Sequence, residues 1–459
     1  MGAPEQIDTG RTDGDWAPPV ARAAVAATVR LPGSKSMTNR ALILAALAET
    51  PTTIIGPLQA RDTNLMTSAI MALGATILLR RADATSADAA SPAGDGVATW
   101  TVTPGCVSGW ASVDVGNAGT VLRFVPPIAG LQKADVEFTG DPRAAHRPVG
   151  ELLAGLRQAG VDIDDDGRGG VPFTVRGSGQ VTGGMVTLDA SASSQLVSGL
   201  LLAAPRFDAG LEITHRGARV PSAPHIAMTA AMLTAAGAEV EAETVNGGAV
   251  PDVWRVRPGR LAPGTIAIEP DLSNSAPFLA AALVTGGRVT FPAWPATSLQ
   301  GADQIMDVLE QMGGRWERDG TGVRIEGRGA IHGIKADVRD VNELAPVLTA
   351  LAALADSPSE LTGIGHMRFH ETDRLAALVA EIGKLGGQVT ELPDGLVIQP
   401  RPLRAGAVPF DSHDDHRMVM AAAVLGLAVP GLRIRNAATV AKTFPEFQVL
   451  WQQMLGQAR

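Results

Sequence analysis

The stretch SKSMTNRALILAALA, residues 34–48, opens with a mostly polar cluster and continues as a wholly apolar run. A helix that is apolar all round is buried rather than laid on a surface. Polar groups at the N-terminus of a buried helix make an anion site. The nucleotide P-loop pattern does not fit, because Ser34 separates Gly33 from Lys35. A simple N-cap at Ser34 or Ser36 is the plain alternative.

Five further stretches have the same construction, an apolar helix-like run behind a polar cluster. They read NAGTVLRFVPPIAG (117–130), SSQLVSGLLLAA (193–204), NSAPFLAAALV (274–284), NELAPVLTALAALA (342–355) and DDHRMVMAAAVLGLAV (414–429). If the six polar ends face a common cleft, each helix dipole favours a bound anion there by roughly 0.3–1 kcal/mol.

A second series of signals recurs in phase with the first. Glycines that close an apolar helical stretch follow one another at intervals of 86, 77, 76, 73 and 70 residues, at Gly74, Gly160, Gly237, Gly313, Gly386 and Gly456. An isoleucine or leucine stands four residues before the first five, at Ile70, Leu156, Leu233, Leu309 and Ile382. A glycine in this place is typical of a helix C-cap. The period predicts six repeated units.

Most units continue after the glycine into a short strand pattern. The segments are 100–103, 173–176, 254–257, 323–326 and 396–399. Most alternate apolar with polar residues, which is typical of a sheet with one solvent-exposed face. We therefore predict an α/β protein of inverse layering, with three α/β units per domain, buried parallel helices inside and sheets outside.

Composition limits the function. The 459 residues are 45% hydrophobic, which supports large cores, and the net charge of −9 argues against nucleic-acid or anionic-membrane partners. No apolar run of 18 residues is present, so we expect no membrane span. The single cysteine, Cys106, excludes an internal disulfide framework and favours a cytoplasmic location.

Cationic side chains stand beside several of the polar clusters. Guanidinium groups bind phosphates and carboxylates in a bidentate manner. The arginines concerned are Arg143, Arg147, Arg374 and Arg417. One stretch, DSHDDHR (411–417), holds three Asp and two His and could suggest a metal site. No second cluster of comparable density accompanies it, so we expect no metal, and take Asp411 as a loop acid and His416 as an active-site residue.

Several motifs together resemble the enolpyruvylshikimate-phosphate synthase family. They are LPGSKSMTNRALILAALA, NAGTVLRF, DPRAAHRP, SASSQ, HETDRL, DDHRM and AKTFP, and they span roughly residues 30–446 in the family's order. The resemblance implies two domains of three units with the active site between them. It places the first domain at 31–264 and the second at 1–30 plus 265–459, because in the family the second domain takes back the N-terminal segment.

The resemblance also implies the reaction. The 5-hydroxyl of shikimate 3-phosphate adds to the enol carbon of phosphoenolpyruvate while the methylene accepts a proton, and elimination of phosphate restores the double bond. This chemistry, a step in aromatic amino-acid (chorismate) biosynthesis, needs cations around the anionic groups and groups that move protons, but no cofactor, metal or redox step. The partners implied are these two small molecules, with a monomeric protein.

Site residues are carried over position by position. The matches for shikimate 3-phosphate are Lys35, Ser36, Arg40, Ser193, Ser194, Ser222, Glu343, His366 and His370. Those for phosphoenolpyruvate are Lys35, Gly119 with Thr120 beside it, Arg147, Gln195, Arg374, Arg417 and Lys442. The catalytic matches are Lys35, Glu343 and Glu371. A carboxylate at a helix start, stabilised only by the dipole, is the structural alternative for Glu371.

The sequence departs from the common family pattern at a few of these positions. Glu343 stands where many members have Asp, and histidines replace Tyr, Asn and Lys at His225, His366 and His370. Since an unperturbed histidine titrates near about 6.5, we expect pH-sensitive binding. Phe124 replaces a Pro behind Gly119. The resemblance implies inhibition by glyphosate pressed against this glycine.

Three other functions compete with this interpretation. The enolpyruvyl transferase that acts on a UDP-sugar usually has a Cys in its active-site loop, and residues 142–148 contain none. A noncatalytic anion-binding scaffold would be expected to lose the acidic pair or Lys35, which are all present. A nucleic-acid-processing relative is disfavoured by the net charge.

Overall fold

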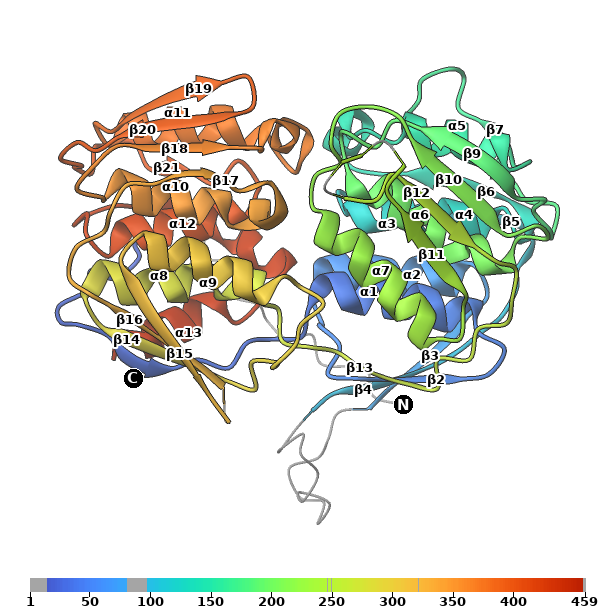
Figure 1. Ribbon diagram of the computed structural model, residues 1–459, viewed down its shortest axis with the longest axis horizontal. Coiled ribbons are helices and arrows are strands. Elements are labelled where there is room, and N and C mark those ends of the chain that lie inside the picture. Colours follow the sequence, from blue (N-terminus) through green and yellow to red (C-terminus); the bar gives the residue numbers. More distant parts are fainter. Residues whose placement is uncertain (1–14, 81–96, 246, 249, 321, 457–459) are drawn as a thin grey trace, which may run out of the picture.

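The computed structural model describes residues 15–80, 97–245, 247–248, 250–320 and 322–456, and it consists of two lobes (Figure 1). Each lobe has three inner helical runs that begin with a polar cluster. In the first lobe they are α1 (Lys35–Leu47), α3 (Gly119–Phe124) continued by α4 (Pro126–Ala129), and α6 (Ser194–Ala203). In the second they are α8 (Ala276–Thr285), α10 (Ala345–Ala353) and α12 (His416–Gly426).

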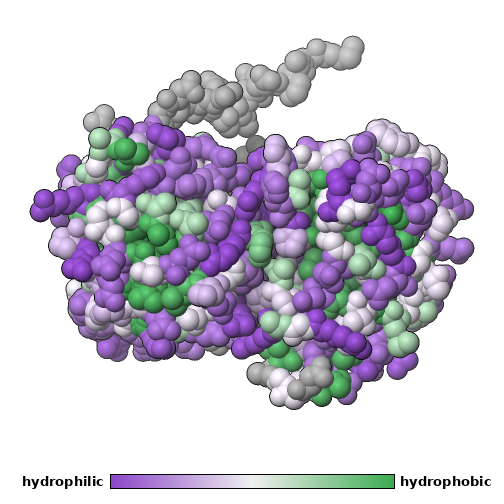
Figure 2. Space-filling model, turned by 90° about the horizontal axis from the view of Figure 1, so that it is seen from above, coloured by the Kyte–Doolittle hydropathy of each residue, from purple (hydrophilic) through white to green (hydrophobic). Residues whose placement is uncertain are grey.

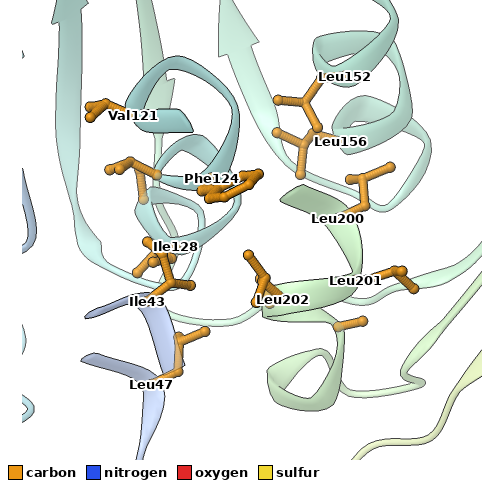
Figure 3. Close-up of a cluster of buried hydrophobic side chains, with 14 of the residues drawn as sticks. Ile43, Leu47, Val121, Phe124, Ile128, Leu152, Leu156, Leu200, Leu201 and Leu202 are labelled. Carbon is orange, nitrogen blue, oxygen red and sulfur yellow. The ribbon is translucent and has the colours of Figure 1, made fainter. Parts of the chain in front are cut away.

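These inner helices are buried on nearly all sides, as their apolar runs predict, and they form the centre of two hydrophobic cores. Figure 3 shows part of the first core, where Phe124 lies among leucines of α5 and α6. Phe124 is fully buried, and the guanidinium carbon of Arg40 lies 5.1 Å from its ring centre. Phe124, which stands where the family commonly has a proline, therefore belongs to the core.

A second set of helices ends at the six recurring glycines. They are α2 (Arg61–Ala72), α5 (Gly150–Gln158), α7 (Ala223–Ala235), α9 (Ala302–Gln311), α11 (Arg374–Lys384) and α13 (Phe447–Met454). Every one of these glycines has a φ between +68° and +102°, a conformation that disfavours other residues. At Gly74 the next residue, Ala75, donates its N–H to the carbonyl of Ile70 (3.1 Å), which is the Schellman pattern. The predicted C-caps are confirmed.

Five four-stranded sheets share one strand order, in which a parallel pair is followed by two antiparallel neighbours. The first-lobe sheets are β13 (Thr265–Ala267)–β2 (Thr52–Ile55)–β4 (Thr99–Thr103)–β3 (Thr76–Arg80), β5 (Ser108–Asp114)–β6 (Lys133–Thr139)–β8 (Phe173–Arg176)–β7 (Asp162–Asp164) and β9 (Gly184–Leu188)–β10 (Leu211–His215)–β12 (Val253–Val256)–β11 (Val240–Glu243). The second-lobe sheets are β1 (Ala26–Thr28)–β14 (Arg288–Pro292)–β16 (Gly322–Gly327)–β15 (Gly314–Asp319) and β17 (Lys335–Asp337)–β18 (Ser359–Thr362)–β20 (Gly395–Gln399)–β19 (Gln388–Leu392). The sixth unit keeps only the parallel pair β21 (Phe410–Asp411)–β22 (Ile434–Arg435).

The lobes exchange one edge strand each. Strand β1 precedes α1 in the chain but pairs with β14 of the second lobe, whereas β13 pairs with β2 of the first. The first-lobe sheet therefore includes Thr265–Ala267, which directly follow the predicted boundary at 264. The described part of the N-terminal segment packs in the second-lobe core through Val25 and Val29, while residues 1–14 lie outside the described residues.

No helix in the part of the chain that the structure describes is both long and apolar enough to cross a membrane.

Candidate active site

A cavity lies at the junction of the lobes, where the inner helices begin. The starts of α1, α3 and α6 contribute Lys35, Ser36, Gly119, Thr120, Ser193 and Gln195. The second lobe contributes Asp271, Ser273, Glu343 and Arg417 from the starts of α8, α10 and α12. Hydrophilic residues lie along the junction on the face seen from above (Figure 2). All six polar clusters therefore meet at one site, where six helix N-termini favour an anion.

The polar clusters act as helix caps and as site walls at once. The Ser34 Oγ accepts a hydrogen bond from the Met37 N–H (3.4 Å), and the Ser193 Oγ accepts one from the Gln195 N–H (3.3 Å). Ser193 both caps α6 and lines the cavity. Ser34 is the N-cap of α1, as the plain alternative predicts, and Ser36 lines the cavity, whereas an anion at this helix start stays a prediction.

Lys35 is held among carboxylates. Its Nζ lies 3.2 Å from Asp62 Oδ2, and its backbone N–H donates to Asp271 Oδ2 at 3.1 Å. Burial lowers the pKa of this lysine, but the negative charges of Asp62, Glu371 and Glu343 more than offset burial, so the pKa lies above 10.5. Lys35 therefore brings a permanent positive charge to the cavity at neutral pH.

Glu343 and Glu371 face the cavity from the second lobe. Glu343 Oε2 accepts hydrogen bonds from Arg417 Nε (3.1 Å) and Arg374 Nη1 (3.4 Å). Glu371 Oε2 accepts one from Arg374 Nη2 (3.0 Å), and Glu371 Oε1 lies 3.6 Å from Arg147 Nη1 of the first lobe.

Both carboxylates are ionised at neutral pH. Burial raises the pKa of each, but the arginines beside them outweigh burial and hold both pKa values well below 4.5. Two ionised carboxylates, each a weaker base than an ordinary glutamate, therefore lie on the wall opposite the first-lobe cations.

Arg374 lies beneath these carboxylates rather than on the cavity wall. It is fully buried, and its Nε and Nη2 donate to the two oxygens of Asp415 at 2.7 and 3.2 Å. Burial lowers its pKa, but Asp415 and Glu371 raise it further than burial lowers it. The Asp415 carboxylate also caps α12 through the Arg417 N–H (2.8 Å). The stretch that could suggest a metal site thus supplies the anchor for two site arginines.

Four other expected residues are also removed from the cavity wall. Arg40 lies below α1, where its guanidinium donates to Thr229 Oγ1 (2.7 Å) and to the His225 carbonyl (3.0 Å). Ser194 is buried in the first turn of α6, and the His366 ring lies beside His370 with 5.4 Å between ring centres. Ser222 has a φ of +54°, and its Oγ accepts a 2.5 Å hydrogen bond from the Asn342 amide of the other lobe.

Lys442 lies at a second cavity that borders the first at Glu371. Its Nζ donates to the Asp414 carbonyl at 2.6 Å. The structure therefore places Lys442 on the outer side of the carboxylate pair.

The four histidines at the site do not titrate near neutral pH. Burial lowers the pKa of His225 and His366 to about 4, and burial with Arg374 nearby lowers that of His370 well below 6.5. His416, whose ring is also buried, is lowered for the same reason, with Lys35 and Arg417 adding to it. The expectation that the three substrate-facing histidines act as sensors near pH 6.5 is wrong for this structure.

This burial predicts acid destabilisation that begins well above the range where carboxylates titrate. Below about pH 6.5 these histidines bind protons in the unfolded chain, but in the folded protein they stay neutral until the pH approaches 4. The free energy of unfolding therefore falls as the pH drops from about 6.5 toward 4. Each histidine contributes at most about 1.4 kcal/mol per pH unit. The urea midpoint should fall between pH 7.5 and 5.5, and it should fall less in His366→Asn.

His146 offers a control for this prediction, because its side chain is exposed. His146→Asn should leave the pH dependence of the urea midpoint as it is in the parent protein. An equal fall in His366→Asn and in the parent would contradict the assignment of the acid sensitivity to the buried histidines.

Sequence reasoning missed several residues of the site. They include Asp62, Arg123, Asp271 and Ser273 on the cavity wall, and Asn342, which binds Ser222 behind it. Three of them, Arg123, Ser273 and Asn342, stand inside or directly beside the polar starts of inner helices. Predicting every polar residue of these clusters as a site residue would have found them. Asp62 begins the second helix of its unit and approaches Lys35 only through folding, and no local pattern marks it.

The fold is that of the enolpyruvyl transferases. An EPSP synthase from Acinetobacter baumannii matches with 24% sequence identity and a TM-score of 0.73, over 95% of this chain and 97% of that one. The enolpyruvyl transferase NikO from Streptomyces tendae matches with 16% identity and a TM-score of 0.70, over 95% and 96% of the two chains. This chain builds that fold from two three-unit lobes with a polar cavity at their junction.

The family follows from the sequence match. The family model described as EPSP synthase (3-phosphoshikimate 1-carboxyvinyltransferase) matches residues 20–451, and the chain belongs to this family. It is a transferase that moves the enolpyruvyl group of phosphoenolpyruvate to the 5-hydroxyl of shikimate 3-phosphate with release of phosphate, in the shikimate pathway of aromatic amino-acid biosynthesis. The three competing functions are thereby set aside.

Proposed function

We propose that both substrates bind in the cavity at the six helix starts, with Lys35 between them. The arrangement that carries the proposal is the Lys35 ammonium among Asp62, Glu343 and Glu371, since this one cation is shared by both walls of the cavity. Two anionic substrates need such a shared charge between them.

Shikimate 3-phosphate is assigned to the side of Ser36, Ser193 and His370. These residues line the cavity, and hydroxyl donors at helix N-termini suit a phosphate. Arg40, Ser194, Ser222, Glu343 and His366 complete the proposed set. Arg40 and Ser222 lie behind this wall. They support it through hydrogen bonds, Arg40 with Thr229 and Ser222 with Asn342.

Phosphoenolpyruvate is assigned to the side of Gly119, Arg147, Gln195 and Arg417, which line the cavity together. Arg374 lies behind the wall and binds Glu343 and Glu371, so its positive charge acts on the ligand from behind these carboxylates. The positive charge of Lys442 acts from the neighbouring cavity. Guanidinium groups on both lobes suit a ligand that has a phosphate and a carboxylate.

The proton transfers are assigned to Lys35, Glu343 and Glu371. Both carboxylates are ionised and so have room for the proton of the 5-hydroxyl, but with pKa values well below 4.5 they are weak bases until their pKa values rise. Bound substrate anions compete with the carboxylates for Arg147 and Arg417, and this competition raises the carboxylate pKa values. Glu371, which contacts arginines of both lobes, is then placed to return a proton to the methylene carbon.

Phosphate release measured with purified protein tests this assignment. Release should require shikimate 3-phosphate and phosphoenolpyruvate together. The KM for shikimate as acceptor should be much higher than that for shikimate 3-phosphate, because shikimate has no phosphate for the hydroxyls at the helix starts to bind. Equal KM values for the two acceptors would contradict a phosphate subsite at Ser36 and Ser193.

We also propose a cytoplasmic monomer. One chain supplies both walls of the cavity, so no second copy is needed to complete it. The free, exposed thiol of Cys106 accords with a reducing compartment.

Substrates should draw the lobes together. Several contacts already join them, among them Arg219 Nη2 to Asp340 Oδ2 (2.7 Å) and Arg143 Nη2 to the Arg368 carbonyl (3.0 Å). Small-angle scattering should give a smaller radius of gyration with both substrates, close to the roughly 23 Å of a compact chain of this length. Salt should weaken the effect by screening. A radius that does not change would contradict closure driven by the two anions.

Glyphosate sensitivity is expected to depend on Gly119. A Cβ built at this position would lie 2.6 Å from Arg147 Nη2 and 2.7 Å from Arg123 Nη1, so alanine must push both guanidinium groups. Such overpacking costs about 1–3 kcal/mol, and an inhibitor bulkier than the substrate bears more of this cost. We expect glyphosate to compete with phosphoenolpyruvate in the parent protein, and Gly119→Ala to raise its inhibition constant roughly tenfold or more, with a smaller rise in KM.

Gly383→Ala is a matched control, because a Cβ there would meet no atom within 4 Å. It should leave both constants unchanged. Insensitivity of a fully active parent protein to glyphosate would contradict the placing of Gly119 against the inhibitor.

A further inference from the structure

Arg123 lines the cavity, yet its guanidinium is committed to the protein. The residue lies near the end of α3 and is 2% exposed. Its Nε and Nη2 donate to the Pro148 carbonyl at 3.0 and 2.8 Å. Its Nη1 donates to the Gly119 carbonyl at 3.3 Å and to Gln195 Oε1 at 3.0 Å. One side chain thus ties together three segments of the first-lobe wall.

The bond to Gln195 decides which end of this amide faces the cavity. A guanidinium group can only donate hydrogen bonds, so the amide atom beside it is the oxygen. The NH2 group of Gln195 is then left for the cavity, which Gln195 also lines. If the amide were reversed, an acceptor oxygen would face the ligand and repel an anion.

The bond to Pro148 acts on the neighbouring clamp residue. Pro148 follows Arg147, whose Nη1 donates to the Asn117 carbonyl at 2.7 Å and faces Glu371 of the other lobe at 3.6 Å. The guanidinium groups of Arg123 and Arg147 both lie beside Gly119, where an added Cβ would touch both. Arg123 therefore holds the loop that carries Arg147 as well as the amide of Gln195.

We propose that Arg123 is a positioning residue that makes this end of the cavity selective for an anion, by locking the Gln195 amide with its NH2 group inward. The inference rests on the assignment of Gln195 to phosphoenolpyruvate. Arg123 does not touch the ligand. It acts mainly through Gln195, so most of its effect should disappear when that amide is absent, and the remainder comes from its hold on the loop of Arg147.

A double-mutant cycle in the full-length protein tests this coupling. Gln195→Met removes the amide, and Arg123→Lys keeps the charge but cannot reach all three acceptors at once. Arg123→Lys should raise the KM for phosphoenolpyruvate roughly tenfold with a smaller change in kcat. In the Gln195→Met background the same change should raise it less than about threefold. An equal rise in both backgrounds would overturn the proposal while leaving the contact of Gln195 intact.

Failure of the underlying contact gives a different result, because Gln195→Met alone would then leave the KM for phosphoenolpyruvate unchanged. Arg206→Lys is the control for loss of a guanidinium-to-carbonyl hydrogen bond elsewhere in the lobe, at an exposed arginine. Its Nη1 donates to the Leu47 carbonyl at 2.7 Å within the same lobe, away from the cavity. It should leave the KM unchanged, and circular dichroism should show that each variant is folded.

Gln195→Glu tests the amide polarity without altering Arg123. A glutamate keeps one oxygen on Arg123 and turns the other toward the ligand. The KM for phosphoenolpyruvate should rise more than in Gln195→Met, by roughly a hundredfold over the parent protein. A rise no larger than that of Gln195→Met would overturn the proposal, because the polarity that Arg123 imposes would then have no effect on binding.

Discussion

Glu371→Gln is expected to lower kcat by roughly 10²–10⁴-fold, the contribution typical of a residue that transfers a proton. The amide keeps the shape and the hydrogen bond to Arg374 Nη2, which now spans 3.0 Å, but it cannot carry a proton to carbon. Binding of shikimate 3-phosphate should persist, because the hydroxyls proposed for its phosphate lie at the starts of α1 and α6. Steady-state kinetics and calorimetric titration of shikimate 3-phosphate measure the two effects separately.

Glu360→Gln is the control for this prediction, since Glu360 pairs with Lys335 on the surface of the same lobe. It should leave kcat unchanged. Near-normal turnover in Glu371→Gln would remove Glu371 from the catalytic assignment and leave it as a carboxylate that only orders Arg147 and Arg374.

Lys35→Met should damage both binding and turnover. Methionine fills a similar volume, but it removes the cation that faces Asp62, Glu343 and Glu371 and that the two substrates share. Loss of one preorganised donor to developing charge typically costs about 10²–10³-fold in kcat. We expect a loss of at least this size in kcat/KM, together with weaker binding of shikimate 3-phosphate.

Lys335→Met is the matched control, because it removes a lysine from an exposed pair in which the partner, Glu360, stays in solvent. Its kinetics should equal those of the parent protein. If Lys35→Met lowered kcat but bound shikimate 3-phosphate as tightly as the parent, Lys35 would serve the chemistry alone and the shared-cation proposal would be wrong.

Much of the fold could be predicted because its signals are local. A glycine such as Gly74 marks a helix end through its own φ of +99°, and an apolar run such as that of α12 shows burial without knowledge of its neighbours. Both recur six times, so each unit supports the prediction for the others. The exchange of β1 and β13 between the lobes was hidden, because a three-residue strand does not show in its own sequence which sheet it joins.

The candidate site divides in the same way. Residues that stand at helix starts, such as Lys35, Gly119 and Glu343, could be placed at the cavity from the sequence pattern and the family resemblance. The pKa of His225 could not, because burial beside Arg40 depends on packing between segments that are 185 residues apart.

The sequence by itself determined the repeated units, the buried helices with their polar ends and the cations that accompany them, because each depends on contacts within a few turns of chain. Only the tertiary structure decided which of those polar groups face the cavity and which support it from behind. Arg374 shows the difference, since its burial and its bonds to Asp415 follow from the packing of α11 against the start of α12. The charge state of each site residue follows from the same packing, because burial and the distance to neighbouring charges set the pKa.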